Sequence, residues 1–346
     1  MGVDTQQRGH IEHIAEALDQ LATLEIRSRQ EQGVIRKLHE AARAKLGKPL
    51  ALGAAELLFD SVSEGDNVIL TTGAGHRQFL PQGETDGPPG AVAIASVLAE
   101  GMRVTPILVT ELELVDNLAA TAAAAGLRLR NNESARTSQI TCTVIAFPAD
   151  NSAAAASADL LDTFQPAALV SIEKIGPNDA GVSHYASGIE TTSERARVEC
   201  LFDLAAVRGV PTIGIGDNGN EIGFGLIADA VRRHKKWGDV CQCPCGAGLA
   251  TRVGTDALVV GSTSNWGAYA VAACLAAMLE RPDLIRDPVI ERHVLEQCVA
   301  AGAFDGSNGL AVPSVDGTPP EASASVQQLM KSVVEICSSE PYERPF

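Results

Sequence analysis

Strand-like and helix-like segments alternate along the middle of this chain, and this alternation limits the possible folds more than any other feature. Short apolar runs, most of them rich in β-branched residues, lie at residues 67–71, 103–109, 140–147, 167–172, 211–215 and 257–260. Longer segments with helical character separate them, at residues 90–100, 111–125, 153–164, 192–208, 220–233 and 266–279. Connections of that length join parallel strands. The sequence therefore predicts an α/β fold with a doubly wound, mainly parallel sheet flanked by helices.

The two ends of the chain differ from the middle because they show helical patterns without strands. We expect a helical N-terminal segment at residues 1–66, an α/β core at residues 67–280 and a helical C-terminal segment at residues 281–346. The three parts are expected to form a single domain over residues 1–346, with two lobes as the alternative. Aromatic residues make up only 4% of the chain, so the core must consist of Ala, Val, Leu and Ile, as in buried parallel sheets.

The charge and the cysteine content limit which partners and which cellular compartment we expect. The formal net charge is −16, which argues against nucleic acid and anionic membranes as partners. No run approaches the roughly 18 apolar residues of a spanning helix, and the polar N-terminus has no apolar signal core. Because the eight cysteines lie mostly in apolar runs, we expect a reducing, cytoplasmic location. The expected partner is a small anionic substrate held by local donors, and a homo-oligomer is left open.

The first polar segment that can carry chemistry follows the first predicted strand, at residues 71–90. Its glycines allow backbone N–H groups to face an anion, so Thr72, Gly73 and Gly75 are candidate substrate-binding residues. Glu84 and Asp86 bring two carboxylates into the same turn, where they can act as acid and base or hold a divalent cation. For Asp86 the alternative is that it caps the helix that follows.

The second polar segment follows the strand at residues 167–172. Glu173 and Lys174 stand where this buried strand ends, and a desolvated charged pair there suits proton transfer. A structural ion pair is the alternative. Asp179, His184 and Tyr185 lie in the loop beyond, where a single histidine is more often a surface residue than a catalyst.

Two further turns follow predicted strands and complete the set of candidates. In the turn at residues 213–225, Asp217 and Glu221 are candidate acid–base groups or metal ligands, and Asn218 and Asn220 are candidate substrate-binding residues. An elaborate capping turn, with Asn220 at the start of a helix, is the alternative. In the turn at residues 262–267, Ser264 and Asn265 are expected to cap the next helix and to point its N-terminus toward the substrate. The tryptophan that follows them either forms a pocket wall or packs in the core.

Three alternating cysteines, Cys241, Cys243 and Cys245, with His234 upstream, raise the question of a zinc site. Structural zinc sites usually separate their cysteines by two to four residues and need a fourth ligand. The spacing here is tighter and the sequence does not identify that fourth ligand. We therefore expect these cysteines to form a turn and to bind no zinc.

Several of these segments together resemble the C-terminal domain of D-glutamate cyclases. The stretches that carry the resemblance are ETDGPPGA at residues 84–91, GDNGNEIGFG at residues 216–225 and SNWGAYA at residues 264–270, with Asp305–Gly306 and residues 315–317. The resemblance covers most of the chain. It implies a stand-alone form of a lyase that converts D-glutamate, or a close analogue, to 5-oxo-D-proline by intramolecular dehydration. Family members also carry Arg and then a small residue or Pro after the Glu173 position, where this chain has Lys174–Ile175–Gly176, which leaves the exact substrate open.

The expected chemistry assigns the carboxylates as a group. Cyclisation needs a base for the amine and a γ-carboxyl activated by protonation or by a cation. No organic cofactor is expected; Mg²⁺ or Mn²⁺ would be held by Asp217 and Glu221. The candidate catalytic residues are Glu84, Asp86, Glu173, Asp217 and Glu221. The alternatives are another metal-dependent hydrolase or lyase acting on a small amino or carboxylic acid, and a ligand-binding module without catalysis.

Overall fold

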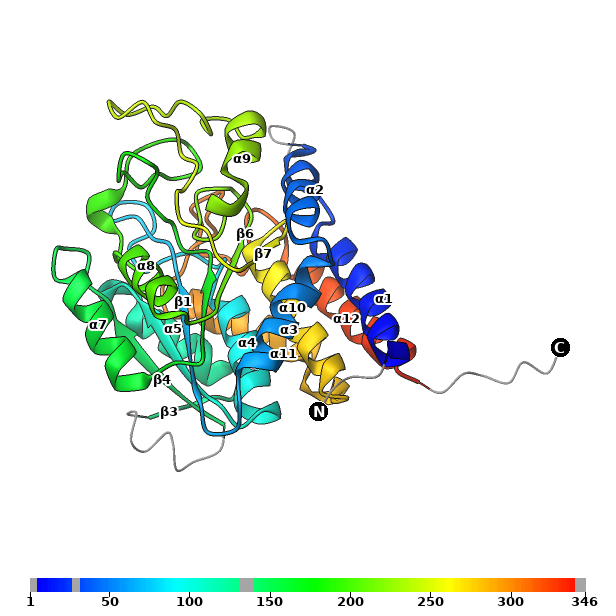
Figure 1. The fold of residues 1–346 in the computed structure, drawn as a ribbon. Helices are drawn as coiled ribbons and strands as arrows, with labels where there is room; N and C mark the ends of the chain where they lie inside the picture. The colour runs from blue at the N-terminus through cyan, green and yellow to red at the C-terminus, as the bar shows by residue number, and fades with distance from the viewer. Residues whose placement is uncertain (1–4, 27–31, 131–139, 340–346) are drawn as a thin grey trace, which may run out of the picture.

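The computed structural model describes residues 5–26, 32–130 and 140–339, and within them one parallel sheet organises the chain (Figure 1). Its strands follow the order β3-β4-β2-β1-β5-β6-β7, and every pair is parallel. Their bounds are Asn67–Thr72 (β1), Thr105–Thr110 (β2), Arg128–Leu129 (β3), Thr141–Ala146 (β4), Ala168–Ile172 (β5), Thr212–Gly216 (β6) and Ala257–Val260 (β7). The predicted α/β fold with a parallel sheet is confirmed; the short β3 was not predicted.

The strand order reverses direction next to β1. After β1 the chain builds the sheet outward through β2 and β4, and it then returns to place β5 on the other side of β1. In open parallel sheets, such a reversal opens a crevice at the carboxyl ends of the two central strands. The turns after β1 and β5 therefore lie at the usual ligand position of this architecture.

Helices cover both faces of the sheet. One face packs on α3 (Leu50–Ser61), α4 (Pro88–Gly101) and α10 (Ser264–Met278), with α1 (Thr5–Ala22) outside them. The other face packs on α7 (Ala153–Phe164) and α8 (Glu199–Arg208), which lie together on one side in Figure 1. Strand residues alternate between the two cores, with Val68 and Leu70 facing the first and Ile69 facing the second, as the period of a strand requires.

The remaining helices extend the first layer. They are α2 (Val34–Leu46), α5 (Val115–Ala124), α9 (Ala228–His234), α11 (Pro288–Ala300) and α12 (Pro320–Cys337). The C-terminal helices α11 and α12 pack on each other, on α5 and on α1 and α10. Trp266 is fully buried, and its indole N–H donates to Ser323 of α12 at 3.1 Å, so it is a core residue. In the described residues, no helix combines the length and the apolar character needed to cross a bilayer.

Three predicted helices begin later than expected, and the smallest delay is that of the helix predicted at residues 111–125, where a 3₁₀ turn precedes α5 at Val115. The segment predicted as a helix at residues 192–208 has only a 3₁₀ turn at its start, and α8 begins at Glu199. The segment predicted as a helix at residues 220–233 is irregular as far as the 3₁₀ turn Gly225–Ile227, and α9 begins at Ala228. Gly223 has a φ of 111°, which no α-helix accommodates, so Asn220 cannot cap a helix there.

Candidate active site

A cavity of about 900 Å³ lies at the carboxyl edge of the sheet, above the reversal between β1 and β5. Four of the predicted site residues line it: Glu84, Glu173, Asn218 and Asn220. The loop at residues 306–309 and Asp316 close it from the C-terminal part of the chain. The structure therefore confirms that turns distant in sequence meet at one edge of the sheet.

The predicted carboxylates form one cluster at the base of this cavity. Oxygen atoms of Asp86, Asp217 and Asp316 lie within 4.8 Å of one another, and so do oxygen atoms of Glu173, Asp217 and Glu221. Burial raises the pKa of Glu84 well above its ordinary value, and the charges of Asp316 and Asp86 raise it further. All five predicted carboxylates are therefore neighbours. Asp316 is a sixth that the sequence analysis did not select, although it belongs to one of the stretches that carry the family resemblance.

Glu173 holds an unusual backbone position directly after β5. Its φ is 50°, a left-handed conformation that costs about 1 kcal/mol or more for a residue with a side chain. This turn directs the carboxylate into the crevice, where the Ser264 hydroxyl donates a hydrogen bond to it. Burial raises the pKa of Glu173 well above its ordinary value, and the nearby carboxylates of Glu221, Asp86 and Glu84 add to the increase. Glu173 is therefore suited to hold a proton at a higher pH than an ordinary glutamate does.

Asp86 and Asn265 cap each other's helices. The Asp86 carboxylate accepts hydrogen bonds from the backbone N–H groups of Ser264 and Asn265, both at 2.8 Å, at the start of α10. In return, the Asn265 side-chain oxygen accepts from the N–H groups of Gly87 at 3.0 Å and Gly90 at 2.8 Å, at the start of α4. The prediction that Ser264 and Asn265 cap α10 is wrong, because Thr263 caps it through the N–H of Trp266 at 3.1 Å.

This exchange changes what the two helix starts can offer a ligand. The N–H groups of Ser264 and Asn265 already donate to Asp86, and helix N-termini bind anions through such N–H groups. The Asp86 carboxylate thus occupies the position in which a substrate carboxylate was expected. Asp86 acts as a cap of α10, and it also accepts a hydrogen bond at 3.1 Å from the N–H of Gly87, at the start of the helix that follows it in sequence.

The Glu221 side chain folds back onto its own turn. Its carboxylate accepts hydrogen bonds from the backbone N–H groups of Asp217 at 3.0 Å, Asn218 at 2.7 Å and Gly219 at 2.6 Å. Burial raises its pKa, while the N–H groups and the charge of Lys235 lower it without cancelling the increase. These donors compete with a cation for the Glu221 oxygens. They make Glu221 the residue that shapes the turn presenting Asp217 and Asn218.

Lys174 pairs with a different carboxylate from the one predicted. Its ammonium donates to Glu111, the residue after β2, and to the carbonyl oxygen of Gly73 at 2.9 Å. Burial raises the pKa of Glu111, but the charges of Lys174 and Arg195 outweigh it and hold that pKa below its ordinary value. The prediction of a charged pair between Glu173 and Lys174 is therefore wrong. Lys174 forms a structural ion pair that fixes the Gly73 turn under the cavity.

Polar groups on the opposite wall can hold an anion. Tyr185 and His76 line the cavity, and the Tyr185 hydroxyl donates to the carbonyl of Gly75 at 2.8 Å. Arg195 donates to the same hydroxyl at 2.6 Å. Lys236 also lines the cavity, with its ammonium 5.1 Å from the centroid of the Trp237 ring. Lys236 and Trp237 were missed in the sequence analysis because the segment that carries them has no strand or helix to place it.

Comparison with known proteins agrees with this site. A model of the family described as D-glutamate cyclase-like, C-terminal, matches residues 13–331. The chain belongs to this family. A human protein named D-glutamate cyclase, mitochondrial, is 33% identical over 225 residues, which cover 62% of this chain and 33% of the human protein. The chain thus spans about a third of the length of that relative.

The D-glutamate cyclase-like region contains every residue of the carboxylate cluster. Gly306 illustrates how its late segments complete the site, since a Cβ there would lie 2.0 Å from a Glu84 carboxylate oxygen. Asp305 shapes the same loop by accepting from the N–H groups of Ser307 at 2.9 Å and Asn308 at 3.1 Å. Glycine at 306 therefore allows the backbone to close directly over the carboxylate.

Proposed function

We propose that this chain is a lyase that converts D-glutamate, or a close analogue, to 5-oxo-D-proline with loss of water. The observation that carries the proposal is a pair of cavity-lining carboxyls, the half-buried Glu84 and the buried Glu173, whose pKa values are both raised. Carboxyls whose pKa lies near the working pH are effective proton donors and acceptors. Membership of the D-glutamate cyclase-like family supports the same reaction.

The reaction needs a base and an acid, and the surroundings of the two glutamates distinguish these two roles. The neighbouring charges that act on Glu173 are carboxylates, which favour its protonated form. Glu84 also faces the charge of Arg195, which acts to lower its pKa and favours its ionised form. We assign Glu84 as the base that takes a proton from the substrate ammonium. Glu173 is then the acid that protonates the oxygen of the γ-carboxyl group.

The bond changes follow from these assignments. The neutral amine nitrogen forms a bond to the γ-carbon of the same molecule, and a carbon–oxygen bond of the γ-carboxyl group breaks to release water. Glu84 then passes the proton from the ammonium to the departing oxygen, which together with the proton from Glu173 completes the water. The Glu173 carboxylate takes the second proton from the nitrogen, so both glutamates return to their starting forms and no external reductant or oxidant is needed. We assign Lys236 and Asn218, which also line the cavity, to the α-carboxylate of the substrate.

A divalent cation is a second way to activate the γ-carboxyl group. The grouping of Asp86, Asp217 and Asp316 is the basis of this alternative, because Mg²⁺ and Mn²⁺ prefer carboxylate oxygens, although backbone N–H groups already donate to both oxygens of Asp86. The pair expected from the sequence, Asp217 and Glu221, fits a cation less well because three backbone N–H groups already point at Glu221.

The test is a direct assay of the purified protein. D-glutamate, L-glutamate and D-glutamine are incubated separately, with Mg²⁺, with Mn²⁺ and after chelation, and chiral chromatography measures 5-oxoproline. We expect the D-enantiomer of 5-oxoproline from D-glutamate. No cyclic product from any of these substrates would contradict the lyase proposal. Saturable binding of D-glutamate without turnover would instead support the non-catalytic module. The cytoplasmic location, the lack of nucleic-acid and membrane partners and a homo-oligomer stay predictions.

A further inference from the structure

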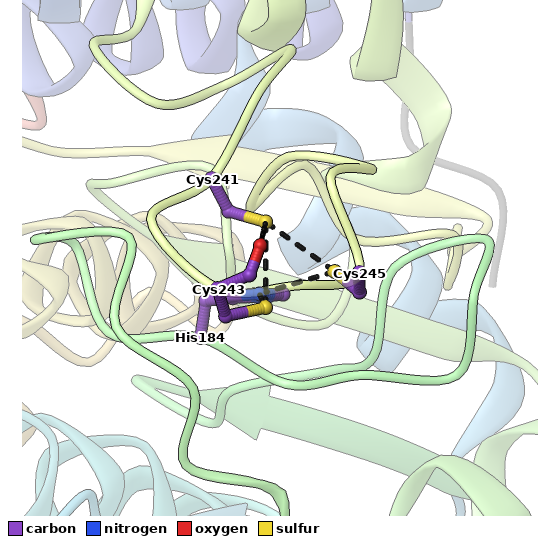
Figure 2. Close-up of side chains that lie close together, drawn as sticks. All are labelled: His184, Cys241, Cys243 and Cys245. Atoms are coloured by element: carbon purple, nitrogen blue, oxygen red, sulfur yellow. Dashed lines mark hydrogen bonds between the residues drawn. The ribbon is translucent and has the colours of Figure 1, made fainter.

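Three cysteines and one histidine outside the carboxylate cluster point toward a common centre (Figure 2). The Cys241 sulfur lies 3.5 Å from that of Cys243 and 3.3 Å from that of Cys245. The Nε2 atom of His184 lies 3.2 Å from the Cys243 sulfur and 3.6 Å from the Cys245 sulfur. His184 is fully buried, and Cys241 is buried as well. The four side chains therefore form a compact group of one nitrogen and three sulfur atoms.

These distances are those of a tetrahedral metal site. With Zn–S bonds of about 2.3 Å and Zn–N bonds of about 2.0–2.1 Å, sulfur atoms of one site lie about 3.8 Å apart and nitrogen lies about 3.6 Å from sulfur. One observed nitrogen–sulfur separation, 3.6 Å, matches these values, and the other three separations, 3.2 to 3.5 Å, are shorter. They are far longer than the roughly 2.05 Å of a disulfide bond, and all three cysteines are free.

The ligand set selects the metal. Thiolate sulfur and imidazole nitrogen in a tetrahedral arrangement favour zinc over the harder cations Mg²⁺ and Ca²⁺. Four protein ligands also leave no position open for water or substrate, which is the mark of a structural zinc site. A further polar contact supports the sulfur atoms, because the Asn178 side-chain amide lies 3.5 Å from the Cys245 sulfur and also donates to the Gly248 carbonyl at 2.7 Å.

The surroundings explain why this part of the chain needs such a site. Between α9 and β7, residues 235–256 contain no helix and no strand of the sheet. The loop is tied to the neighbouring segment by two hydrogen bonds of Gln242, from its N–H to the Gly188 carbonyl at 3.0 Å and from its side chain to the Ser187 carbonyl at 2.6 Å. A loop of this length without regular structure lacks the ladder of hydrogen bonds that holds a helix or strand.

We propose that His184, Cys241, Cys243 and Cys245 bind one structural zinc ion. The fourth ligand that the sequence did not identify is His184, which stands 59 residues before Cys243 in the chain; His234 is not part of the group. This proposal replaces the expectation that the cysteines bind no zinc. It is independent of the proposed lyase chemistry, because the ion would have no open coordination position.

The zinc ion joins two walls of the cavity. His184 precedes Tyr185, and the cysteines flank Gln242 and follow Trp237, all of which line the cavity. The carbonyl of His184 also accepts a hydrogen bond at 2.8 Å from the side chain of Asn220, another lining residue. Metal binding thus fixes the segment at residues 184–189 and the loop at residues 236–245 in the positions that shape the substrate side of the cavity.

The first test measures the metal itself in the full chain. The protein is purified without chelators and without metal-affinity resin, and its metal content is determined by inductively coupled plasma mass spectrometry. We expect about one zinc per chain, with an X-ray absorption spectrum of three sulfur neighbours and one nitrogen neighbour. Zinc-free protein is incubated with Zn²⁺ under reducing conditions and measured again. A zinc content that stays near zero after this step, or a spectrum without sulfur neighbours, would overturn the proposal.

The second test uses matched cysteine variants. Cys243→Ser and His184→Ala should each lose most of the bound zinc, whereas Cys200→Ser, which alters another half-buried cysteine outside the group, should retain it. Circular dichroism checks that the variants fold. Because a ligand variant can fail to fold, Co²⁺ is also substituted into the wild-type protein, where thiolate-to-cobalt charge transfer is expected. Equal zinc in Cys243→Ser and wild type, or cobalt-loaded protein without charge-transfer absorption, would exclude this site.

Discussion

The carboxylate cluster and the thiol group border the same cavity but are held in place by different means. Glu173 and Asp217 stand directly after β5 and β6, so the sheet fixes their backbone. Backbone N–H groups fix the side chains of Asp86 and Glu221. The thiols lie in a loop without regular structure. The comparison teaches that the chemistry of the pocket is built on rigid elements, whereas its outer wall depends on side-chain ligands.

The largest effect on activity is expected for Glu173→Gln, which tests whether the carboxylate cluster at the end of the sheet performs the chemistry. The amide can still accept the hydrogen bond from the Ser264 hydroxyl, but it cannot donate a proton as an acid. Turnover should fall by roughly a hundredfold or more, with little change in the thermal midpoint. The matched control is Asp179→Asn, since Asp179 forms an exposed ion pair with Arg232 at 2.6 Å. Full activity in Glu173→Gln would remove Glu173 from the mechanism.

The next largest effect is a loss of stability when a residue of the carboxylate cluster is replaced. Asp86→Ala removes the acceptor for the N–H groups of Ser264 and Asn265 and should lower the free energy of unfolding by about 2 kcal/mol. Urea unfolding followed by circular dichroism measures it. A loss below a few tenths of a kcal/mol would mean that α10 does not depend on this cap.

A smaller effect, on substrate binding, is expected when zinc is removed from the proposed site in the loop at residues 235–256. A chelator that strips the ion should weaken substrate binding about tenfold, which corresponds to about 1.4 kcal/mol, with a smaller change in turnover because the carboxylates keep their positions. The KM and kcat of D-glutamate conversion, measured before chelation, after chelation and again after zinc is restored, separate the two quantities. An unchanged KM would show that the loop keeps its shape without the metal.

The smallest effect is the pH dependence of stability. A carboxyl whose pKa is raised by folding binds its proton more tightly in the folded state, so it stabilises the protein at low pH. That contribution is lost as the pH rises from about 4.3, the ordinary value for Glu, through the raised pKa. The thermal midpoint of the wild type should therefore fall more steeply over this range than that of Glu173→Gln, whose amide does not ionise. Parallel curves for the two proteins would show that Glu173 is ionised throughout.

The sequence predicted the sheet well because buried parallel strands are apolar and short. The residues after β1, β5 and β6 could be selected as a site for the same reason, since the ends of parallel strands meet at one edge. Pair contacts could not be predicted. Lys174 binds Glu111, which lies 63 residues away, and no local pattern distinguishes this partner from the adjacent Glu173.

The other errors have the same physical origin. An asparagine followed by a glutamate is typical of a helix start. Here the Glu221 carboxylate accepts hydrogen bonds from backbone N–H groups of its own turn, and α9 begins only at Ala228. The residues of the proposed zinc site were not recognised as one group, because the residue that completes it is a histidine from a segment distant in sequence. Local sequence propensity predicts helices and strands, whereas polar contacts between residues distant in sequence can be identified only in the folded structure.

The exchange of caps between Asp86 and Asn265 has a consequence for how this protein can change. Each side chain satisfies the backbone of the other's helix, so a substitution at one position alters what the other must supply. The two positions should show strong epistasis: Asp86→Ala and Asn265→Ala together should cost less than the sum of the two single changes. A change at either position alone removes a cap from the start of α4 or α10. We therefore expect residues 86 and 265 to change together in evolution.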